Sequence, residues 1–257
     1  IVCGIVGTLT VVRCNTYVAG AVSHTILAGL GFAQYSNTVG LLPFYVSPDV
    51  AALITALFVA ILISILQFNG RVKKDSSLSA VWAVGMAIGL FFLSITPGYQ
   101  TDLMRYMFGS IAMATIGDVY FVLSLAILII VSCFCFWRGI LASCFNSTLL
   151  RLNGGCAFFF ELIVSILSAV AIVVLVKTVG IVLVIALITL PSISTLGMHT
   201  NLVFAMLIAA VFSFVSLLFG IVVSMYFNIE AAAPTVILIA IIVLVSQLIK
   251  KIGQYAK

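Results

Sequence analysis

Charged residues are scarce in this sequence. Of its 257 residues, 7% are Asp, Glu, Lys or Arg and 65% are hydrophobic, whereas soluble domains carry about 25% charged residues. None of the four charged types occurs between Thr178 and Ile229. A soluble fold cannot bury so much apolar surface. The composition therefore excludes a single water-soluble domain and predicts an all-α, polytopic membrane protein.

Motifs of catalytic and nucleotide-binding domains are also missing. The sequence contains no GxxxxGK[ST], GxGxxG or HExxH pattern, and its six cysteines form no CxxC pair. The cysteines therefore fit apolar packing better than a metal site or a disulfide. Any active transport must draw its energy from another chain or from an ion gradient. The net charge of +5 is explained by membrane topology and anionic lipid, so the predicted partner is the bilayer and no nucleic acid.

Nine apolar segments predict a single transmembrane domain over residues 1–257, a bundle of about eight or nine helices. The first segment is too short to span a bilayer alone, so we expect the natural N-terminus to be missing. The segments run approximately from Val2 to Val12, Thr16 to Tyr35, Asp49 to Phe68, Leu78 to Thr96, Val119 to Trp137, Cys156 to Val176, Val179 to Gly197, Leu202 to Phe227 and Pro234 to Ile249.

The placement of Lys and Arg predicts the orientation in the membrane. If the loop that contains Arg71 is cytoplasmic and each segment crosses once, nine of the eleven Lys and Arg residues lie on the cytoplasmic side. Only Arg105 and Lys177 then lie outside, as the positive-inside rule requires. This orientation also predicts a cytoplasmic C-terminus.

The run from Tyr17 to Ala33 carries one ionisable residue, His24. On a helix its neighbours are mostly small: Gly20, Ala21, Leu27, Ala28 and Gly31. An imidazole that faces lipid would be unsatisfied, so His24 is expected to point into the protein or a water-filled path, as a metal ligand or proton carrier. The alternative is a histidine that only hydrogen-bonds a neighbouring helix.

Other candidates for the path lie in the second half of the chain. A helix broken at Pro191, with Ser192 beside the break, would place polar backbone near the His24 helix, although proline kinks also occur without function. Glu161, inside the sixth segment, either has a path or gating role or reaches the interface by snorkelling. His199 either receives the exiting ion or is an incidental loop histidine.

The cytoplasmic loop over residues 138–155 has the pattern of a short amphipathic helix. Asn146 is placed to cap it, Leu149 and Leu150 contribute to an apolar face, and Gly154 is placed to end it. Such a helix is either a docking site for a partner or an interfacial helix resting on lipid.

Several stretches, in order, resemble the membrane permeases of the zinc and manganese class of ABC transporters, over nearly the whole chain. They are IVCGIVGTLTVVR with YVAGAVSHTILAGLG, KKDSSLSAVWAVGMAIGLFF, DLMRYMFGSI, FNSTLLRLNG and GIVLVIALITLPSIS. The resemblance implies a homodimeric or pseudo-dimeric permease in the cytoplasmic (inner) membrane of a prokaryote. A separate ATPase would drive it, and an extracytoplasmic metal-binding protein would feed it.

The resemblance also implies roles for particular residues. His24 matches the transmembrane histidine that lines the family's path, whereas Gly20 stands where many members carry Asp. The loop over 145–154 matches the coupling helix that enters the ATPase, and its residues singled out for this role are Phe145, Asn146, Leu149, Leu150 and Gly154.

The predicted cargo is a divalent metal ion, with no permanently bound cofactor and no enzymatic activity in this chain. Imidazole suits zinc, so zinc is the first choice, with manganese or ferrous iron as alternatives. An ion-gradient-driven transporter is a second reading, but it needs buried acids, and only Glu161 and His24 are available. A third reading, an intramembrane enzyme using His24, finds no paired Asp or Ser with a base nearby.

Overall fold

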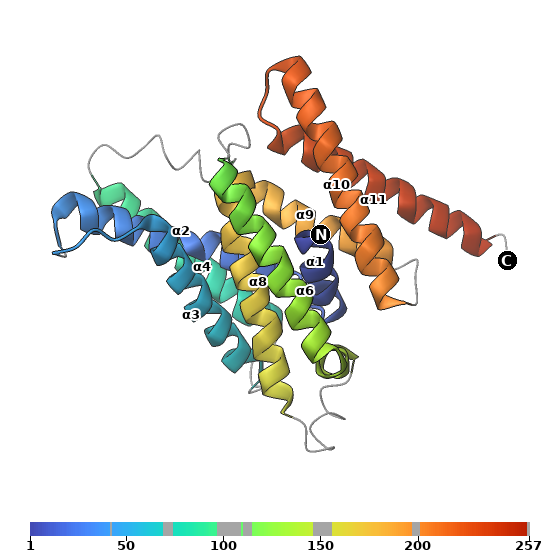
Figure 1. Ribbon diagram of the computed structural model, residues 1–257, viewed down its shortest axis with the longest axis horizontal. Coiled ribbons are helices and arrows are strands. Elements are labelled where there is room, and N and C mark those ends of the chain that lie inside the picture. Colours follow the sequence, from blue (N-terminus) through green and yellow to red (C-terminus); the bar gives the residue numbers. More distant parts are fainter. Residues whose placement is uncertain are drawn as a thin grey trace.

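The computed structural model describes residues 1–41, 43–68, 74–96, 109, 115–145, 156–196 and 201–255. Within these ranges the chain forms helices and no strands (Figure 1). The helices are α1 (Val2–Val12), α2 (Tyr17–Val39), α3 (Pro48–Phe68), α4 (Lys74–Ile95), α6 (Ile116–Phe145), α8 (Ala157–Val179), α9 (Ile181–Leu196), α10 (Leu202–Phe227) and α11 (Ala232–Tyr255). The predicted all-α bundle is therefore confirmed.

Each of the nine predicted segments corresponds to one of these helices. The bounds of α1 and α10 agree with the prediction, while others extend into polar sequence. Helix α4 begins at Lys74 with Asp75 in its first turn, where the helix dipole favours an acid. Helix α6 continues to Phe145, past a kink at Phe136. The start of the predicted 138–155 loop is therefore helical.

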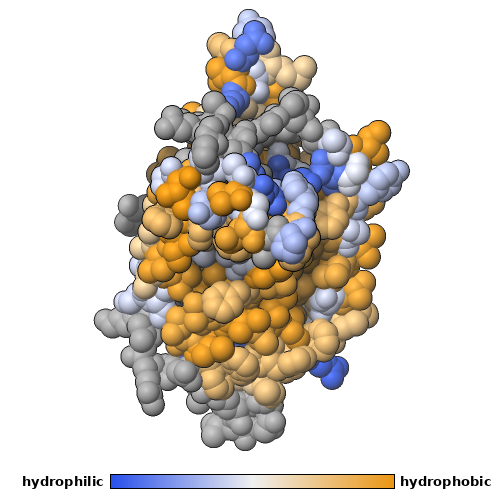
Figure 2. Space-filling view, turned by 90° about the vertical axis from the view of Figure 1, so that its left-hand side faces the viewer, coloured by the Kyte–Doolittle hydropathy of each residue, from blue (hydrophilic) through white to orange (hydrophobic). Residues whose placement is uncertain are grey.

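Five helices of the described chain are long and apolar enough to cross a membrane. They are α3, α4 from Asp75, α6, α8 and α10. Helices α1 and α2 meet the same test only as a pair, bent by 117° at the turn between them. Figure 2 shows the resulting apolar surface across the middle of one face, with hydrophilic residues gathered near its upper part. The protein is an integral membrane protein.

Helix α8 lies in the middle of the bundle and contacts α3, α6, α1 and α2. Helices α2, α3 and α4 pack on one side of it, and the α10–α11 pair lies on the other (Figure 1). Helix α1 joins the two halves because it packs against α9 and α10 as well as α8. The α1–α2 turn is therefore held at the centre of the molecule, and α2 carries His24 away from that turn.

Candidate functional site

His24 lies on α2 and faces α4. Its ring stacks on the indole of Trp82, with ring centroids 5.0 Å apart and an angle of 13° between the planes. Both side chains are half-buried. The histidine therefore lies between two helices, and the indole covers one face of its ring.

The stack is possible because α2 and α4 pack closely. Gly85 and Gly89 are four residues apart and so lie on one face of α4. A Cβ atom at Gly89 would lie 2.7 Å from the carbonyl carbon of Leu27, and one at Gly85 would collide with the side chain of Thr25. Glycines at this spacing let helix backbones approach in membranes. This approach brings the indole against α2.

Gly20 lies one turn before His24 on the same face of α2. A Cβ atom there would lie 3.6 Å from the nearest ring atom of Trp82, which is ordinary van der Waals contact. The indole therefore covers Gly20 and stacks on His24 at the same time. Any longer side chain at position 20 would have to share this space with the indole.

The imidazole of His24 has no hydrogen bond or ion pair to any residue that the structure describes. Within the same residues, no group of three or more His, Cys, Asp or Glu side chains is placed to hold a metal ion. The site is thus a single imidazole whose two ring nitrogens have no partner among the residues that the structure describes. Such a site can offer one ligand to a metal, and the remaining ligands must come from water or from elsewhere.

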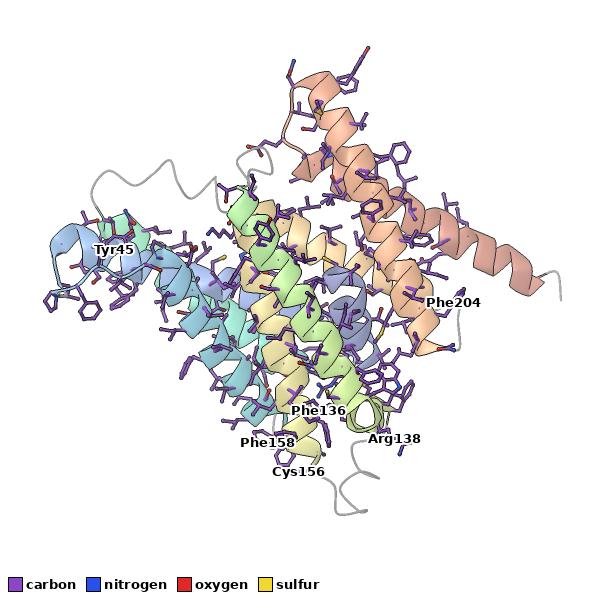
Figure 3. All side chains as sticks on the ribbon, in the orientation of Figure 1. Tyr45, Phe136, Arg138, Cys156, Phe158 and Phe204 are labelled. Atoms are coloured by element: carbon purple, nitrogen blue, oxygen red, sulfur yellow. The ribbon has the colours of Figure 1, made fainter. Side chains whose placement is uncertain are left out.

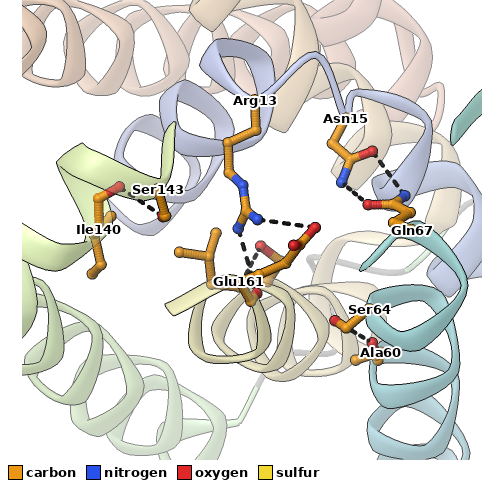
Figure 4. Close-up of polar contacts among 10 residues, drawn as sticks. Arg13, Asn15, Ala60, Ser64, Gln67, Ile140, Ser143 and Glu161 are labelled. Atoms are coloured by element: carbon orange, nitrogen blue, oxygen red, sulfur yellow. Dashed lines mark hydrogen bonds and ion pairs between the residues drawn. The ribbon is translucent and has the colours of Figure 1, made fainter. Parts of the chain in front are cut away.

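Glu161, the second predicted path residue, lies on α8 and pairs with Arg13 at the end of α1 (Figure 4). The Arg13 Nη2 to Glu161 Oε1 distance is 3.3 Å, and Nη1 of Arg13 donates to the Glu161 backbone carbonyl at 3.4 Å. Both side chains are buried, with 7% and 12% exposed. The pair ties the α1–α2 turn to α8.

A second buried polar pair lies beside this one (Figure 4). The side-chain amides of Asn15 and Gln67 exchange two hydrogen bonds, Asn15 Nδ2 to Gln67 Oε1 at 2.7 Å and Gln67 Nε2 to Asn15 Oδ1 at 3.0 Å. Asn15 lies in the α1–α2 turn and Gln67 near the end of α3. We name Arg13, Asn15, Gln67 and Glu161 the polar corner.

The other end of α8 carries an exposed ion cluster. Lys177 Nζ lies 2.9 Å from Asp49 Oδ2 and 3.4 Å from Asp118 Oδ1. The orientation predicted from charge places these three residues on the outer side, and the structure brings them together at one end of the bundle.

Helix α9 runs without a break through Pro191 to Leu196, so the broken helix that the sequence left open at this proline does not form. Ser194 donates its hydroxyl to the carbonyl of Pro191, and Thr195 donates to that of Ser192. The hydroxyl of Ser192 is buried, lies close to Gly7 of α1 and has no hydrogen-bond partner in the described chain. Pro191 has no N–H to donate to the carbonyl of Leu187, one turn earlier, and the Ser213 hydroxyl of α10 donates to that carbonyl at 3.4 Å.

Most of the predicted coupling residues, namely Asn146, Leu149, Leu150 and Gly154, lie outside the described residues, as does His199. Phe145 ends α6 and is 69% exposed. Figure 3 shows that Arg138 on α6 and Cys156 before α8 lie at the same end of the molecule. The kinked part of α6 lines a cavity of about 530 Å³ together with Phe160.

Two features of the site were not predicted from the sequence. Trp82 was part of a family-like stretch but carried no predicted role, and the pairing of Arg13 with Glu161 joins residues far apart in the chain. The spacing of Gly85 and Gly89 could have indicated that Trp82 lies near a helix contact. Two glycines four residues apart mark the face of α4 that another helix approaches.

Comparison with known proteins places the chain in a family. A model described as ABC 3 transport family matches residues 1–251. The probable metal transport system membrane proteins of Chlamydia muridarum and Chlamydia trachomatis are 33% and 32% identical over 73% and 74% of this chain. These matches span 64% of each relative's length. The manganese transport system membrane protein MntC of Halalkalibacterium halodurans is 25% identical over 92% of this chain and 78% of its own length.

A solved structure supports the fold. A chain of PsaBC from Streptococcus pneumoniae, in complex with Fab, matches with a TM-score of 0.80 over 96% of this chain and 86% of that chain, at 22% identity. The family resemblance drawn from the sequence motifs is confirmed by the match over residues 1–251. The chain belongs to the ABC 3 transport family.

Proposed function

We propose that this protein is the permease subunit of an ATP-driven importer of divalent transition-metal ions, with His24 in the metal path. The observation that carries the proposal is the imidazole of His24, which has no hydrogen-bond or ion-pair partner in the described part of the chain. It is half-buried in an apolar bundle and is oriented by an aromatic stack. Polar side chains inside membranes are costly and usually have a partner or a function. An imidazole with no polar partner among the described residues is available to a passing metal ion.

The ligand chemistry supports transient binding. A permease must release its ion, so one imidazole completed by water serves it better than a closed four-ligand site. Imidazole binds zinc well, whereas manganese prefers oxygen ligands. Zinc is therefore the first ion to test. Manganese and ferrous iron are the next ions to test. The name of the relative from Halalkalibacterium halodurans includes manganese.

The predicted partners complete the proposal. A separate ATPase subunit would bind the cytoplasmic loop over 145–154, and an extracytoplasmic metal-binding protein would deliver the ion. The permease would assemble as a homodimer or pseudo-dimer in the inner membrane of a prokaryote, with a cytoplasmic C-terminus. The family membership of this chain supports these assignments.

Metal uptake tests the proposal. Vesicles that contain the assembled transporter, with its ATPase and binding protein, should accumulate zinc or manganese when ATP is supplied. We expect His24→Ala to reduce uptake to background, whereas His199→Ala, the variant of the only other histidine in the sequence, should cause a smaller loss. Uptake by His24→Ala at the wild-type rate would remove the histidine from the path.

The ATPase contact is tested separately. Substituting Leu149 and Leu150 with Asp should abolish ATP-dependent uptake while the permease still assembles in the membrane. Retained uptake in this variant would contradict a coupling role for the loop. Uptake driven by an ion gradient, without the ATPase, would favour the secondary-transporter reading.

A further inference from the structure

We propose that Trp82 is a positioning residue for the metal site, one that fixes the plane of the His24 imidazole and fills the space beside Gly20. This inference rests on the proposed function, because it assigns to Trp82 the orientation of the group that contacts the metal. Three observations carry it: the stack of the two rings, the glycine-lined approach of α4 to α2, and the missing hydrogen bonds of His24 within the described chain.

Among the residues that the structure describes, the ring stack on Trp82 is the contact that orients the imidazole. Histidine ligands are commonly held in place by a hydrogen bond from the second ring nitrogen to a carboxylate or carbonyl. His24 has no such bond to a described residue. The indole supplies the missing restraint from the face of the ring.

Stacking leaves the metal-binding atoms free. The lone pair of an imidazole nitrogen lies in the plane of the ring, so an indole stacked on one face does not block it. The indole nitrogen is a hydrogen-bond donor only and does not ligate a cation. Trp82 therefore orients the ligand without adding one.

The same indole limits what position 20 contributes. Because Trp82 lies 3.6 Å from a Cβ placed at Gly20, the space one turn before His24 is apolar and occupied. The site therefore has one protein ligand from this helix face, and the ion keeps water ligands. We therefore expect the site to bind the metal ion weakly and to release it rapidly.

The first experiment uses Trp82 as its own reporter. The sequence has two tryptophans, Trp82 and Trp137, so Trp137→Phe leaves one indole in the full chain, purified with its ATPase in lipid nanodiscs. Added Co²⁺, which quenches nearby indole fluorescence, should quench Trp82 saturably. His24→Gln in this background should remove the saturable phase. Equal quenching with and without the imidazole would place the metal elsewhere and overturn the proposal.

The second experiment separates positioning from folding. Holding a flexible side chain in place is worth about 0.5–1.5 kcal/mol, or about 2- to 10-fold in affinity. Trp82→Leu should therefore raise the KM for zinc uptake by about that factor while the maximal rate per folded transporter is retained. Trp82→Phe, which keeps a ring to stack, should restore a KM near that of the wild type.

The outcomes distinguish the two proposals. If Trp82→Leu and Trp82→Phe both show the wild-type KM while His24→Gln abolishes uptake, the positioning role is wrong and the metal path stands. If His24→Gln transports normally, the proposed path itself fails. Should Trp82→Leu not fold, Trp82→Met replaces it, and an unchanged KM in that variant contradicts the positioning role.

Discussion

The polar corner and the His24 site are two ways of placing polar side chains inside one apolar bundle. At the polar corner, Arg13 pairs with Glu161, and Asn15 pairs with Gln67. At the other site, His24 has an aromatic neighbour and no polar partner in the described chain. The corner joins the α1–α2 turn to α8 and α3, whereas the histidine lies further along α2 against α4.

This difference in pairing distinguishes polar groups that stabilise the fold from those that are available to bind a ligand. A buried polar group is stabilised when its partners are present and is costly when they are lost. The side chains of the polar corner pair with one another, so substituting them should mainly lower the stability of the fold. The imidazole of His24 has no such partner within the described ranges, so its removal should affect ligand binding more than stability.

The largest expected effect is at Glu161. Glu161→Ala leaves the Arg13 guanidinium buried without its carboxylate, and breaking a buried ion pair in this way costs about 3–5 kcal/mol. We expect a large loss of thermal stability in detergent, measured as the fraction of folded protein after heating. The double variant Arg13→Ala with Glu161→Ala should be less destabilised than the sum of the two single variants. Additive losses would show that the two residues are not coupled.

The next largest loss of stability is expected where α2 and α4 approach closely. Gly89→Ala forces a methyl group against the backbone of Leu27, and overpacking of this kind costs about 1–3 kcal/mol. The variant should lose stability and weaken the contact between Trp82 and His24, which the fluorescence of Trp82 reports. Gly20→Ala is the matched control, because its methyl group meets Trp82 at normal contact distance. Equal stability of the two variants would contradict the described packing.

The amide pair should give a smaller loss. Gln67→Ala leaves the buried amide of Asn15 without its partner, at a cost of about 1–3 kcal/mol. Because the pair lies beside the corner's ion pair, we expect lower thermal stability with metal affinity unchanged. A variant that loses metal affinity but keeps its melting temperature would move the functional site towards the corner.

The smallest effect is expected at the exposed end of α8. Asp49→Asn removes a charge that pairs with Lys177, but both side chains are about half exposed. Exposed ion pairs contribute below about 1 kcal/mol. The melting temperature should change little, and the residual effect should disappear in high salt. A loss as large as that of Glu161→Ala would mean that burial does not distinguish the two pairs.

Local patterns in the sequence predicted the helices but not the pairings between them. The bounds of α1 and α10 follow from apolar runs that end at polar residues or turns. The partner of Glu161 could not be predicted, because Arg13 is separated from it by 148 positions and the contact depends on how α1 packs on α8. The stack of Trp82 on His24 could not be predicted for the same reason, because it depends on how α4 packs on α2.

The sequence left open whether the helix breaks at Pro191, and the structure gives a physical reason why it does not. Proline removes one backbone hydrogen bond, but nearby hydroxyls can satisfy the freed carbonyls and let a helix continue. The carbonyl that Pro191 leaves without a backbone donor is that of Leu187, and Ser213 of the neighbouring helix α10 donates its hydroxyl to it. The sequence showed both the proline and the hydroxyls, and only the packing decides between a break and a continuous helix.

The most direct test of the comparison measures stability and zinc uptake together in His24→Gln, in vesicles with the complete transporter. We expect uptake near background and a melting temperature close to that of the wild type. In the same assay, Glu161→Ala should lose stability first. If His24→Gln loses stability to the same extent as Glu161→Ala, or takes up zinc at the wild-type rate, the histidine is structural and the central claim is contradicted.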